Sequence, residues 1–286
     1  MKKQKELDKE SVDIRTLAEE SLKGKFRRYL LSRFCKAIKE YDLIQPNDKI
    51  AVCISGGKDS MCMAKLFQEV QKYNKIPFSV EYLVMDPGYN KKNRKKIEDN
   101  AKLLGLPITI FETNIFENVY HIGSSPCYMC ARMRRGSLYS KAKELGCNKI
   151  ALGHHYDDVI ETILLGVLYG AQVQTMMPKL HSNNFEGMQL IRPMYLIREQ
   201  DIKRWRDYCG LEFIQCACKI SEQNAQPDTF GSKRQKVKDI IAKLSKEEQQ
   251  VESNIFRSVE GVNLATIISY KDKEGKIHSF LDDYDK

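Results

Sequence analysis

The sequence lacks a long apolar stretch, and this absence excludes integral membrane proteins. Among its 286 residues the longest apolar run extends only from Ile163 to Tyr169, whereas a helix that spans a bilayer needs about 20 predominantly apolar residues. Charged residues make up 30% of the chain, and its mean hydropathy is −0.49. The composition is therefore that of a folded, soluble protein with no membrane partner.

An apolar stretch ending in small residues is also missing near the beginning, where lysines alternate with acidic and polar residues over residues 1–10. Such a segment is not typical of a secretory signal, so the expected location is the cytoplasm. In that reducing compartment the nine cysteines are not expected to form a disulfide framework. They are instead core residues, metal ligands or catalytic groups, and their spacing distinguishes these roles.

Acidic residues are fewer than basic ones. The chain has 38 Asp and Glu and 47 Lys and Arg, which gives a formal net charge of +9. An excess of positive charge permits a polyanionic partner such as RNA, although many basic proteins bind none. Basic clusters occur at residues 91–96, 132–135, 198–206 and 233–238. Most are interpreted as solvated helix faces, with Lys233 and Arg234 as candidate contacts to an RNA backbone.

Short β-branched runs alternate with segments of helical periodicity along most of the chain. The predicted strands are Lys49–Ile54, Val80–Met85, Ile108–Phe111, Lys149–Leu152 and Gln189–Arg192. The predicted helices between and after them are Met61–Tyr73, Lys91–Leu104, Arg132–Leu145, Asp157–Tyr169 and Arg198–Tyr208. This order predicts an α/β fold with a doubly wound, mostly parallel sheet and helices on both faces. Ligands are expected at the carboxyl ends of its strands.

The remaining segments are predicted to be helical extensions on either side of this sheet domain. Residues 1–45 form an N-terminal helical extension that includes an amphipathic helix at Phe26–Tyr41. Residues 46–222 form the sheet domain, and residues 223–286 form a basic helical tail that begins with a polar linker at Gln223–Gly231.

A glycine-rich loop, Ser55–Ser60, lies between the first predicted strand and the helix that follows it. Gly56 and Gly57 let the backbone approach a phosphate, and the amides and dipole of a helix N-terminus favour an anion there. Hydroxyl groups and the Lys58 ammonium add donors. The spacing matches neither a Walker loop nor a dinucleotide-binding fold. The alternative is an ordinary tight turn between strand and helix.

Two cysteines separated by two residues, Cys127 and Cys130, precede a predicted helix that carries Arg132, Arg134 and Arg135. Thiolates near a helix start and near cations are favoured, which suits metal binding or redox chemistry. A second pair, Cys216 and Cys218, lies far downstream and offers further ligands. Spacing alone leaves a structural zinc site, a redox disulfide and coincidence open. Cys35, Cys53, Cys62, Cys147 and Cys209 are predicted core residues.

A second polar loop, Gly153–Asp158 with the sequence GHHYDD, follows the fourth predicted strand. It is therefore expected at the same sheet edge as the glycine loop. Adjacent carboxylates at a helix start are also common as caps. Asp157 is interpreted as the cap, and Asp158 as a magnesium ligand or proton acceptor.

The glycine loop SGGKDS resembles the PP-loop of the ATP pyrophosphatase superfamily. The segments CYMCARMRRG (Cys127–Gly136), ALGHHYDD (Ala151–Asp158) and IRP (Ile191–Pro193) further resemble the tRNA 2-thiocytidine synthetase family, with similarity from about residue 48 to about residue 216. That resemblance implies a tRNA thiolation enzyme. It would use ATP and Mg²⁺ to adenylate O2 of a cytidine, cytidine 32 of the anticodon loop, and then replace that oxygen with sulfur.

The resemblance also assigns roles to residues. It implies ATP binding by Ser55, Gly56, Gly57, Lys58, Asp59, Ser60, His154 and His155, and catalysis by Asp59, Asp158 and Arg134. Arg134 would neutralise a phosphate or the developing oxyanion. Further implied partners are tRNA, a sulfur donor that is either a cysteine desulfurase or free sulfide, and a second copy of the chain in a homodimer.

Family members hold a 4Fe-4S cluster on three cysteines and use it to deliver the sulfur. Cys127 and Cys130 match the paired ligands. The third ligand in the family belongs to a Pro-Cys pair, but here Gln215 replaces the proline and Ala217 alone separates the two cysteines. Cys216 is the preferred third ligand and Cys218 the alternative. The rival functions are another PP-loop tRNA ligase, such as lysidine synthetase, and a zinc-stabilised RNA-binding protein without catalysis.

Overall fold

The computed structural model of the chain describes residues 13–73, 76–116, 126–214, 229–282 and 284. The chain forms two compact units. Unit 1 comprises Met1–Val159 and Met177–Pro227, and unit 2 comprises Ile160–Met176 and Asp228–Lys286. The domain limits at residues 45/46 and 222/223 stay predictions. In the described part of the chain, no helix is both long and apolar enough to cross a membrane.

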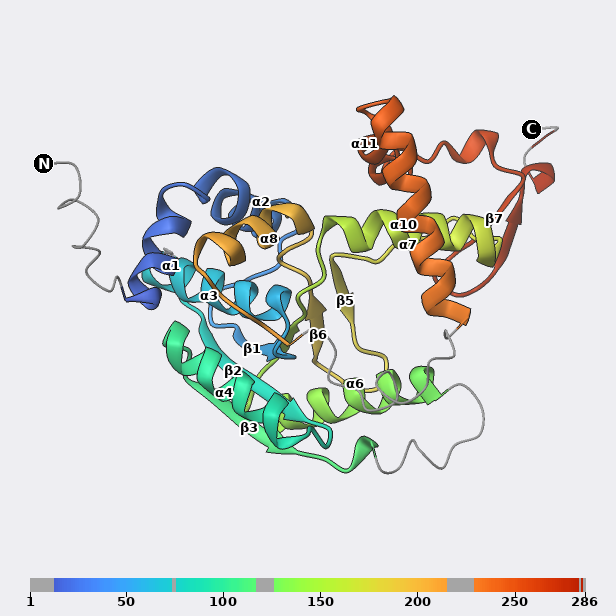
Figure 1. The fold of residues 1–286 in the computed structure, drawn as a ribbon. Coiled ribbons are helices and arrows are strands. Elements are labelled where there is room, and N and C mark those ends of the chain that lie inside the picture. Colours follow the sequence, from blue (N-terminus) through green and yellow to red (C-terminus); the bar gives the residue numbers. More distant parts are fainter. Residues whose placement is uncertain (1–12, 74–75, 117–125, 215–228, 283, 285–286) are drawn as a thin grey trace, which may run out of the picture. The chain divides into compact units, whose positions relative to one another are not determined.

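Unit 1 is built on a six-stranded sheet with the strand order β3-β2-β1-β4-β6-β5. All neighbouring strands are parallel except β5, which is antiparallel to β6 (Figure 1). The strands are β1 (Lys49–Ile54), β2 (Ser79–Asp86), β3 (Ile108–Glu112), β4 (Lys149–Ala151), β5 (Lys179–His181) and β6 (Gln189–Ile191). The predicted mostly parallel sheet is confirmed, and β5 is an edge strand that the pattern did not predict.

Strand order reverses between β1 and β4. From β1 the chain winds outward to β2 and β3, and then returns to place β4 on the other side of β1, where Ala51 pairs with Ile150. Such a switch point opens a crevice at the carboxyl ends of the two strands. The glycine loop follows β1 and the GHHYDD loop follows β4. Topology alone therefore brings the two predicted loops together.

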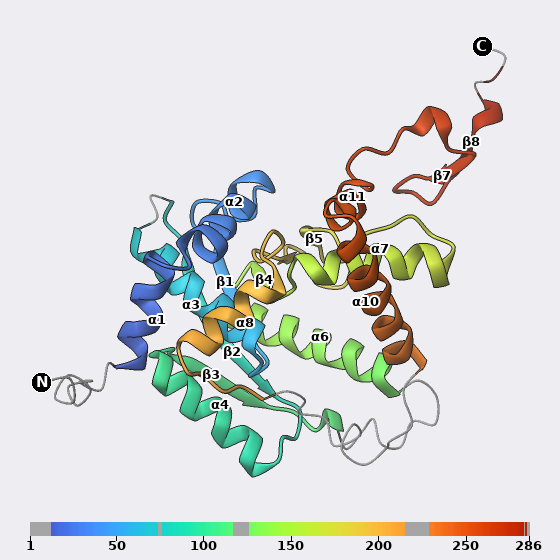
Figure 2. The ribbon, with the colours of Figure 1, turned by 45° about the horizontal axis from the view of Figure 1, so that its top comes forward.

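Helices cover both faces of the sheet (Figures 1 and 2). The helices of unit 1 that precede the return of the chain from β3 to β4 are α1 (Ile14–Lys23), the π-helical turn η1 (Arg27–Leu31), α2 (Ser32–Glu40), α3 (Lys58–Tyr73) and α4 (Lys91–Leu104). Those that follow are α6 (Pro126–Glu144), α8 (Glu199–Tyr208) and the first turn of α7 (Tyr156–Gly170), whose later residues belong to unit 2. Ala51 and Cys53 pack toward Tyr139 and Ala142 of α6, so alternate residues of β1 face α3.

Helix α6 begins earlier than predicted. The pattern predicted a start at Arg132, but the helix starts at Pro126. Proline is favoured in the first helical turn because that turn needs no amide hydrogen and because the ring already fixes the helical φ angle. Cys127 and Cys130 consequently lie inside the first two turns rather than before the helix.

The N-terminal helix α1 is tied to α3 by a buried lysine. Lys65 is fully buried, and its Nζ donates to Glu19 Oε1 at 2.8 Å, to Gln68 Oε1 at 2.9 Å and to the carbonyl oxygen of Leu104 at 2.9 Å. Burial lowers the pKa of Lys65, and the Glu19 carboxylate opposes that shift. All three donors of this ammonium are used. The predicted N-terminal helical extension is thus an integral layer on α3.

Unit 2 combines most of α7 with α10 (Thr229–Glu247), α11 (Val251–Arg257), the short 3-10 turns η2 (Leu264–Thr266) and η3 (Phe280–Asp282), and a hairpin of β7 (Ser269–Lys271) and β8 (Ile277–Ser279). The predicted tail is helical only in its first part. Arg234 binds the buried Glu161 at 2.6 Å, and Lys233 lies 5.3 Å from the centre of the Tyr169 ring. Both predicted RNA contacts therefore have partners inside unit 2.

Candidate active site

The glycine loop has a shape that only glycine allows at its second position. Gly56 has φ +84°, and a Cβ there would lie 2.6 Å from Ile97 Cγ1. Ser60, which is buried, closes the loop: its hydroxyl donates to the Gly57 carbonyl at 3.0 Å and accepts from the Ser55 amide at 3.1 Å. Ser60 was expected to donate its hydroxyl hydrogen to a ligand, but this hydrogen is instead donated to the Gly57 carbonyl and stabilises the loop.

A cavity of about 800 Å³ opens beside this loop. Its lining residues come from the start of α3, from α8 and from the segment after it: Gly57, Lys58, Asp59, Lys203, Arg206, Asp207, Leu211, Glu212, Phe213 and Ile214. The amides of the first turn of α3 have no acceptor within the helix, and the helix dipole adds positive potential there. A cavity with these amides and the cations Lys58, Lys203 and Arg206 suits a polyphosphate.

The lysine of the loop lies between two carboxylates. Lys58 Nζ is 3.0 Å from Asp59 Oδ2 and 2.8 Å from Glu199 Oε1. Burial by itself lowers the pKa of Lys58, but these carboxylates raise it overall. Burial likewise raises the pKa of Glu199, yet Lys203 and Lys58 lower it to about 2. Lys58 and Glu199 are therefore both charged at neutral pH.

One carboxylate oxygen in this cavity has no partner. Asp59 Oδ1 is buried and accepts no hydrogen bond from the described residues, and His155 Nε2 lies 3.8 Å from it. An unpaired buried carboxylate oxygen is costly unless a ligand completes its surroundings. A hard cation such as Mg²⁺ takes oxygen ligands of this type. The cavity thus fits a nucleotide phosphate chain together with a cation at Asp59.

The GHHYDD loop meets the glycine loop at van der Waals distance. A Cβ at Gly153 would lie 3.2 Å from the Ser60 amide nitrogen and 3.3 Å from the Asp59 carbonyl carbon. Backbone packs on backbone at this point. The two strand-end loops predicted to share one sheet edge are therefore in direct contact, and this part of the prediction is confirmed.

His155 is the buried centre of the GHHYDD loop. Its Nδ1 accepts the amide hydrogen of Asp158 at 3.4 Å, and the Asp158 carboxylate accepts the His155 amide at 3.0 Å. An acceptor at Nδ1 places the proton of the neutral imidazole on Nε2, the nitrogen that faces Asp59. His154, the other predicted histidine, lies half-buried in the same loop.

The interpretation of Asp157 as the cap of its own helix is wrong. The carboxylate that accepts the amide at the start of α7 belongs to Asp158. Asp157 instead accepts the Glu199 amide at 2.7 Å and lies 3.2 Å from Arg198 Nη2. It therefore caps α8 and fixes that helix against the loop. No local signal reveals this role, because the residues are 42 positions apart.

Helix α6 contributes Cys130 and Arg134 near the carboxyl end of β2. Cys130 is partly exposed and packs on an apolar cluster of Met85 and Ile115. Burial raises the pKa of Tyr89, which follows β2, while the charge of Arg134 opposes the shift and Cys130 adds to it. Tyr89, Arg134 and Cys130 are thus electrostatic neighbours.

The rest of the predicted cysteine site is not described. The side chain of Cys127, and Cys216 and Cys218 entirely, lie outside the described residues. Within the described part of the chain, no group of three His, Cys, Asp or Glu side chains is arranged to hold a metal ion. The ligand set therefore stays a prediction.

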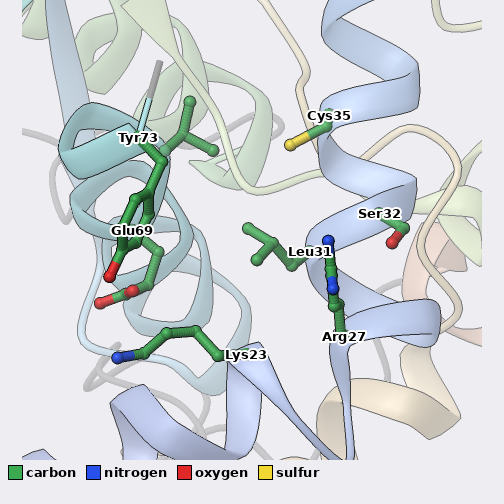
Figure 3. Close-up of a pocket in the computed structure, with 8 residues that line it drawn as sticks. Lys23, Arg27, Leu31, Ser32, Cys35, Glu69 and Tyr73 are labelled. Carbon is green, nitrogen blue, oxygen red and sulfur yellow. The ribbon is translucent and has the colours of Figure 1, made fainter.

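The prediction that the other cysteines are core residues is correct for four of them and wrong for one. Cys53, Cys62, Cys147 and Cys209 are buried, but Cys35 is exposed. Cys35 lines a second cavity, of about 630 Å³, between η1, α2 and α3 (Figure 3). Glu69 and Tyr73 line its opposite side. Because this cavity contains none of the predicted site residues, it is not the candidate active site.

Two charged residues of α8 at this site were missed from the sequence: Lys203, which lines the cavity, and Glu199, which pairs with Lys58. Glu199 and Lys203 belong to α8, whose acidic first turn indicates only a helix start. Glu199 reaches Lys58 because α8 packs on α3, more than 140 residues apart in the chain. Only the fold brings these charges together, so a motif could not reveal them.

Known proteins resemble this chain over most of its length. A family described as a PP-loop domain matches residues 28–223. A tRNA-cytidine(32) 2-sulfurtransferase of Anaeromyxobacter dehalogenans is 32% identical over 82% of this chain and 79% of its own length. The enzyme of that name from Vibrio vulnificus is 34% identical over 88% of this chain and 80% of its own.

A solved structure shares the fold. The U34-tRNA thiolase of Methanococcus maripaludis, determined with its 4Fe-4S cluster, superposes with a TM-score of 0.63 over 82% of this chain and 80% of its own length. Its sequence identity to this chain is 22%.

Proposed function

Because the chain belongs to the family of tRNA-cytidine(32) 2-sulfurtransferases, with a PP-loop domain over residues 28–223, we propose that it thiolates tRNA at the expense of ATP. The reaction adenylates O2 of cytidine 32 in the anticodon loop, releases pyrophosphate and exchanges the AMP-bearing oxygen for sulfur. One structural observation carries the proposal: the phosphate-binding cavity at the glycine loop directly adjoins the GHHYDD loop at the switch point of the sheet.

The glycine loop performs the ATP half of the reaction. The backbone of Gly56, Gly57 and Lys58 and the hydroxyl of Ser55 bind the phosphates that leave as pyrophosphate, and Ser60 holds the loop closed. Lys58, fixed by Glu199, neutralises charge that accumulates on the phosphate chain. Asp59 provides the carboxylate oxygen for Mg²⁺, the cation that ATP normally carries.

The GHHYDD loop handles the acceptor side. His154 contacts the nucleotide, and His155 holds Asp59 and Asp158 on either side of its ring. Asp158 is positioned by the His155 amide to accept a proton or to bind the cation. Arg134 stabilises negative charge on the reacting oxygen. The cytidine must be unstacked to expose its O2, and bases of a single-stranded loop meet that requirement.

Sulfur distinguishes this reaction from other PP-loop chemistry. We assign Cys127, Cys130 and Cys216 as ligands of a 4Fe-4S cluster, with Cys218 as the alternative third ligand. The cluster, when bound, supplies the sulfur atom, which a cysteine desulfurase or free sulfide delivers to the enzyme. Partly exposed Cys130 beside Arg134 suits a cluster site that must meet an anionic substrate. The expected cytoplasmic location and homodimer belong to this proposal.

The test combines a product assay with cysteine variants. Protein purified without oxygen is supplied with ATP, Mg²⁺, sulfide and an unmodified tRNA transcript, and nucleosides are examined by mass spectrometry for 2-thiocytidine. Serine at Cys127, Cys130 or Cys216 should remove the brown iron-sulfur absorption and the product while ATP binding persists. Cys218→Ser should have the milder effect. Lysine incorporation instead of sulfur, or tight zinc without iron, would refute the proposal.

A further inference from the structure

A third cavity lies in unit 1 between α6 and the β5–β6 hairpin, whose chain runs beside α6 (Figure 1). Its volume is about 590 Å³. It shares no lining residue with the cavity at the glycine loop. The lining residues are Ala131, Arg132, Arg135, Gly136, Tyr139, Leu180, His181, Ser182, Asn183, Asn184, Phe185, Leu190 and Arg192.

The lining carries positive charge and no carboxylate. Arg132 and Arg135 are one helical turn apart on α6, and both are exposed. Arg192 approaches from the end of β6. The remaining polar groups come mainly from the hairpin and include His181, Ser182, Asn183 and Asn184. Three guanidinium groups around one cavity repel one another unless an anion lies between them.

Arg192 is the buried member of the three. It is only 6% exposed. One Nη donates to the carbonyl oxygen of Met177, but its Nε is buried and has no hydrogen-bond partner among the described residues. Burial first, and then the charge of Arg135, lower the pKa of Arg192 to about 10. A buried guanidinium with an unused donor is costly on its own, so this position favours a ligand that accepts hydrogen bonds.

The cavity is also close to the acceptor side of the candidate active site. Arg192 interacts electrostatically with Asp158, and Arg132 and Arg135 flank Arg134 on α6. The rings of Tyr139 and Phe185 stack with their centroids 5.1 Å apart and form an apolar wall of the cavity. A ligand here would therefore lie beside, and not in, the ATP cavity.

We infer that this cavity binds a phosphodiester group of the RNA substrate close to the modified nucleotide, with Arg132, Arg135 and Arg192 as its donors. Guanidinium groups bind phosphate through paired hydrogen bonds, which fixes position as well as adding affinity. Such contacts set the register of a nucleic acid on a protein without selecting sequence. The inference rests on the proposed tRNA substrate and deepens it.

The primary test measures binding of an unmodified tRNA transcript by Arg132→Gln, Arg135→Gln and the double variant. Because each loses an exposed phosphate contact, each single variant should bind about fivefold more weakly, with a salt slope smaller by about one. The double variant should combine these losses, and ATP affinity should stay unchanged. Arg28→Gln, an exposed arginine of η1, controls for net charge. Wild-type affinity and salt slope in the double variant would overturn the inference.

Arg192 needs a conservative variant because it is buried. Arg192→Lys retains the charge but not the Nε donor, and it should weaken RNA binding while its circular dichroism spectrum stays that of the wild type. If Arg192→Lys does not fold, the Arg132→Gln and Arg135→Gln variants decide the test. The cavity could bind free phosphate rather than a phosphodiester of RNA. Comparing the thermal unfolding midpoint in sodium phosphate with that in sodium chloride at equal ionic strength distinguishes these two ligands. Arg135-dependent stabilisation by free phosphate with unchanged RNA binding would overturn the inference.

The thiolation assay distinguishes the inference from the proposed function. If the arginine variants bind tRNA weakly but the wild type makes no 2-thiocytidine, the proposed function is refuted and the phosphate-binding role of the cavity stands. Normal thiolation and normal tRNA binding by the double variant would refute the cavity and retain the function. A wild type that binds no RNA would refute both.

Discussion

Helix α3 carries two charged clusters with opposite characters. At its centre, Lys65 is fully buried and gives all three hydrogens to Glu19, Gln68 and Leu104. At its first turn, Lys58 and Asp59 border a cavity, and Asp59 Oδ1 remains buried without a partner. A satisfied buried charge stabilises one arrangement of the chain, whereas an unsatisfied one at a cavity indicates a ligand. Four predictions test this distinction.

The largest effect is expected at Asp59. Asp59→Ala removes the unpartnered carboxylate and should reduce ATP-dependent thiolation about a thousandfold, because its charge is needed where the phosphate chain and cation bind. The midpoint of urea unfolding should hardly change. Asp99→Ala, on an exposed position of α4, is the matched control. Near-normal turnover by Asp59→Ala would contradict the role of the first-turn cluster.

The second prediction compares the adjacent carboxylates of α7. Asp158→Asn should lower the rate of thiolation about a hundredfold, within the range for general acid–base groups. Asp157→Asn should mainly lower the free energy of unfolding, by about 1 kcal/mol, because Asp157 caps α8 and pairs with Arg198. Single-turnover rates and urea unfolding of both variants check the order. A larger rate loss in Asp157→Asn would exchange the two assignments.

The third prediction concerns the satisfied cluster. Glu19→Gln should destabilise the protein by about 2 kcal/mol, because Lys65 loses its charged acceptor while it remains buried. ATP affinity should not change, since Glu19 lies outside the cavity. Glu20→Gln alters the neighbouring exposed side chain and should cost at most about 0.5 kcal/mol. Equal losses of stability in the two variants would remove the contrast between the clusters.

The smallest effect is the pH dependence of that contribution. Burial raises the pKa of Glu19, but Lys65 and Lys72 lower it overall to about 2. A carboxylate with a depressed pKa stabilises the folded state fully above its unfolded pKa of about 4.5, and this stabilisation is lost as the pH falls toward 2. The stability difference between wild type and Glu19→Gln should therefore shrink by about 1 kcal/mol between pH 6 and pH 3. Urea unfolding at each pH measures it, and a growing difference would contradict the assignment.

Local patterns were sufficient for most of the sheet. β1 and α4 match their predicted limits, because β-branched runs and helical periodicity are properties of neighbouring residues. The loops at the carboxyl ends of β1 and β4 were placed together correctly, since parallel topology dictates that edge. The start of α6 was missed because Pro126 and the two cysteines interrupt the periodic pattern without interrupting the helix.

Tertiary partners could not be predicted. β5 has three residues and one neighbour, so its sequence has too little alternation to identify it. Glu199 beside Lys58, Asp157 beside Arg198, and Arg192 among the arginines of α6 are pairings between distant parts of the chain. Composition shows that these charges exist. Only packing determines which of them are neutralised by protein and which are left for a ligand.

The contact at Gly153 makes the positions of the two loops depend on each other. With no side chain between them, the backbones of the two loops have no flexible spacer that could absorb a displacement. A displacement of the glycine loop would therefore press directly on the segment that carries His155 and Asp158. In the proposed mechanism, the position of the Asp158 carboxylate thus depends on that of the glycine loop through a contact of backbone with backbone.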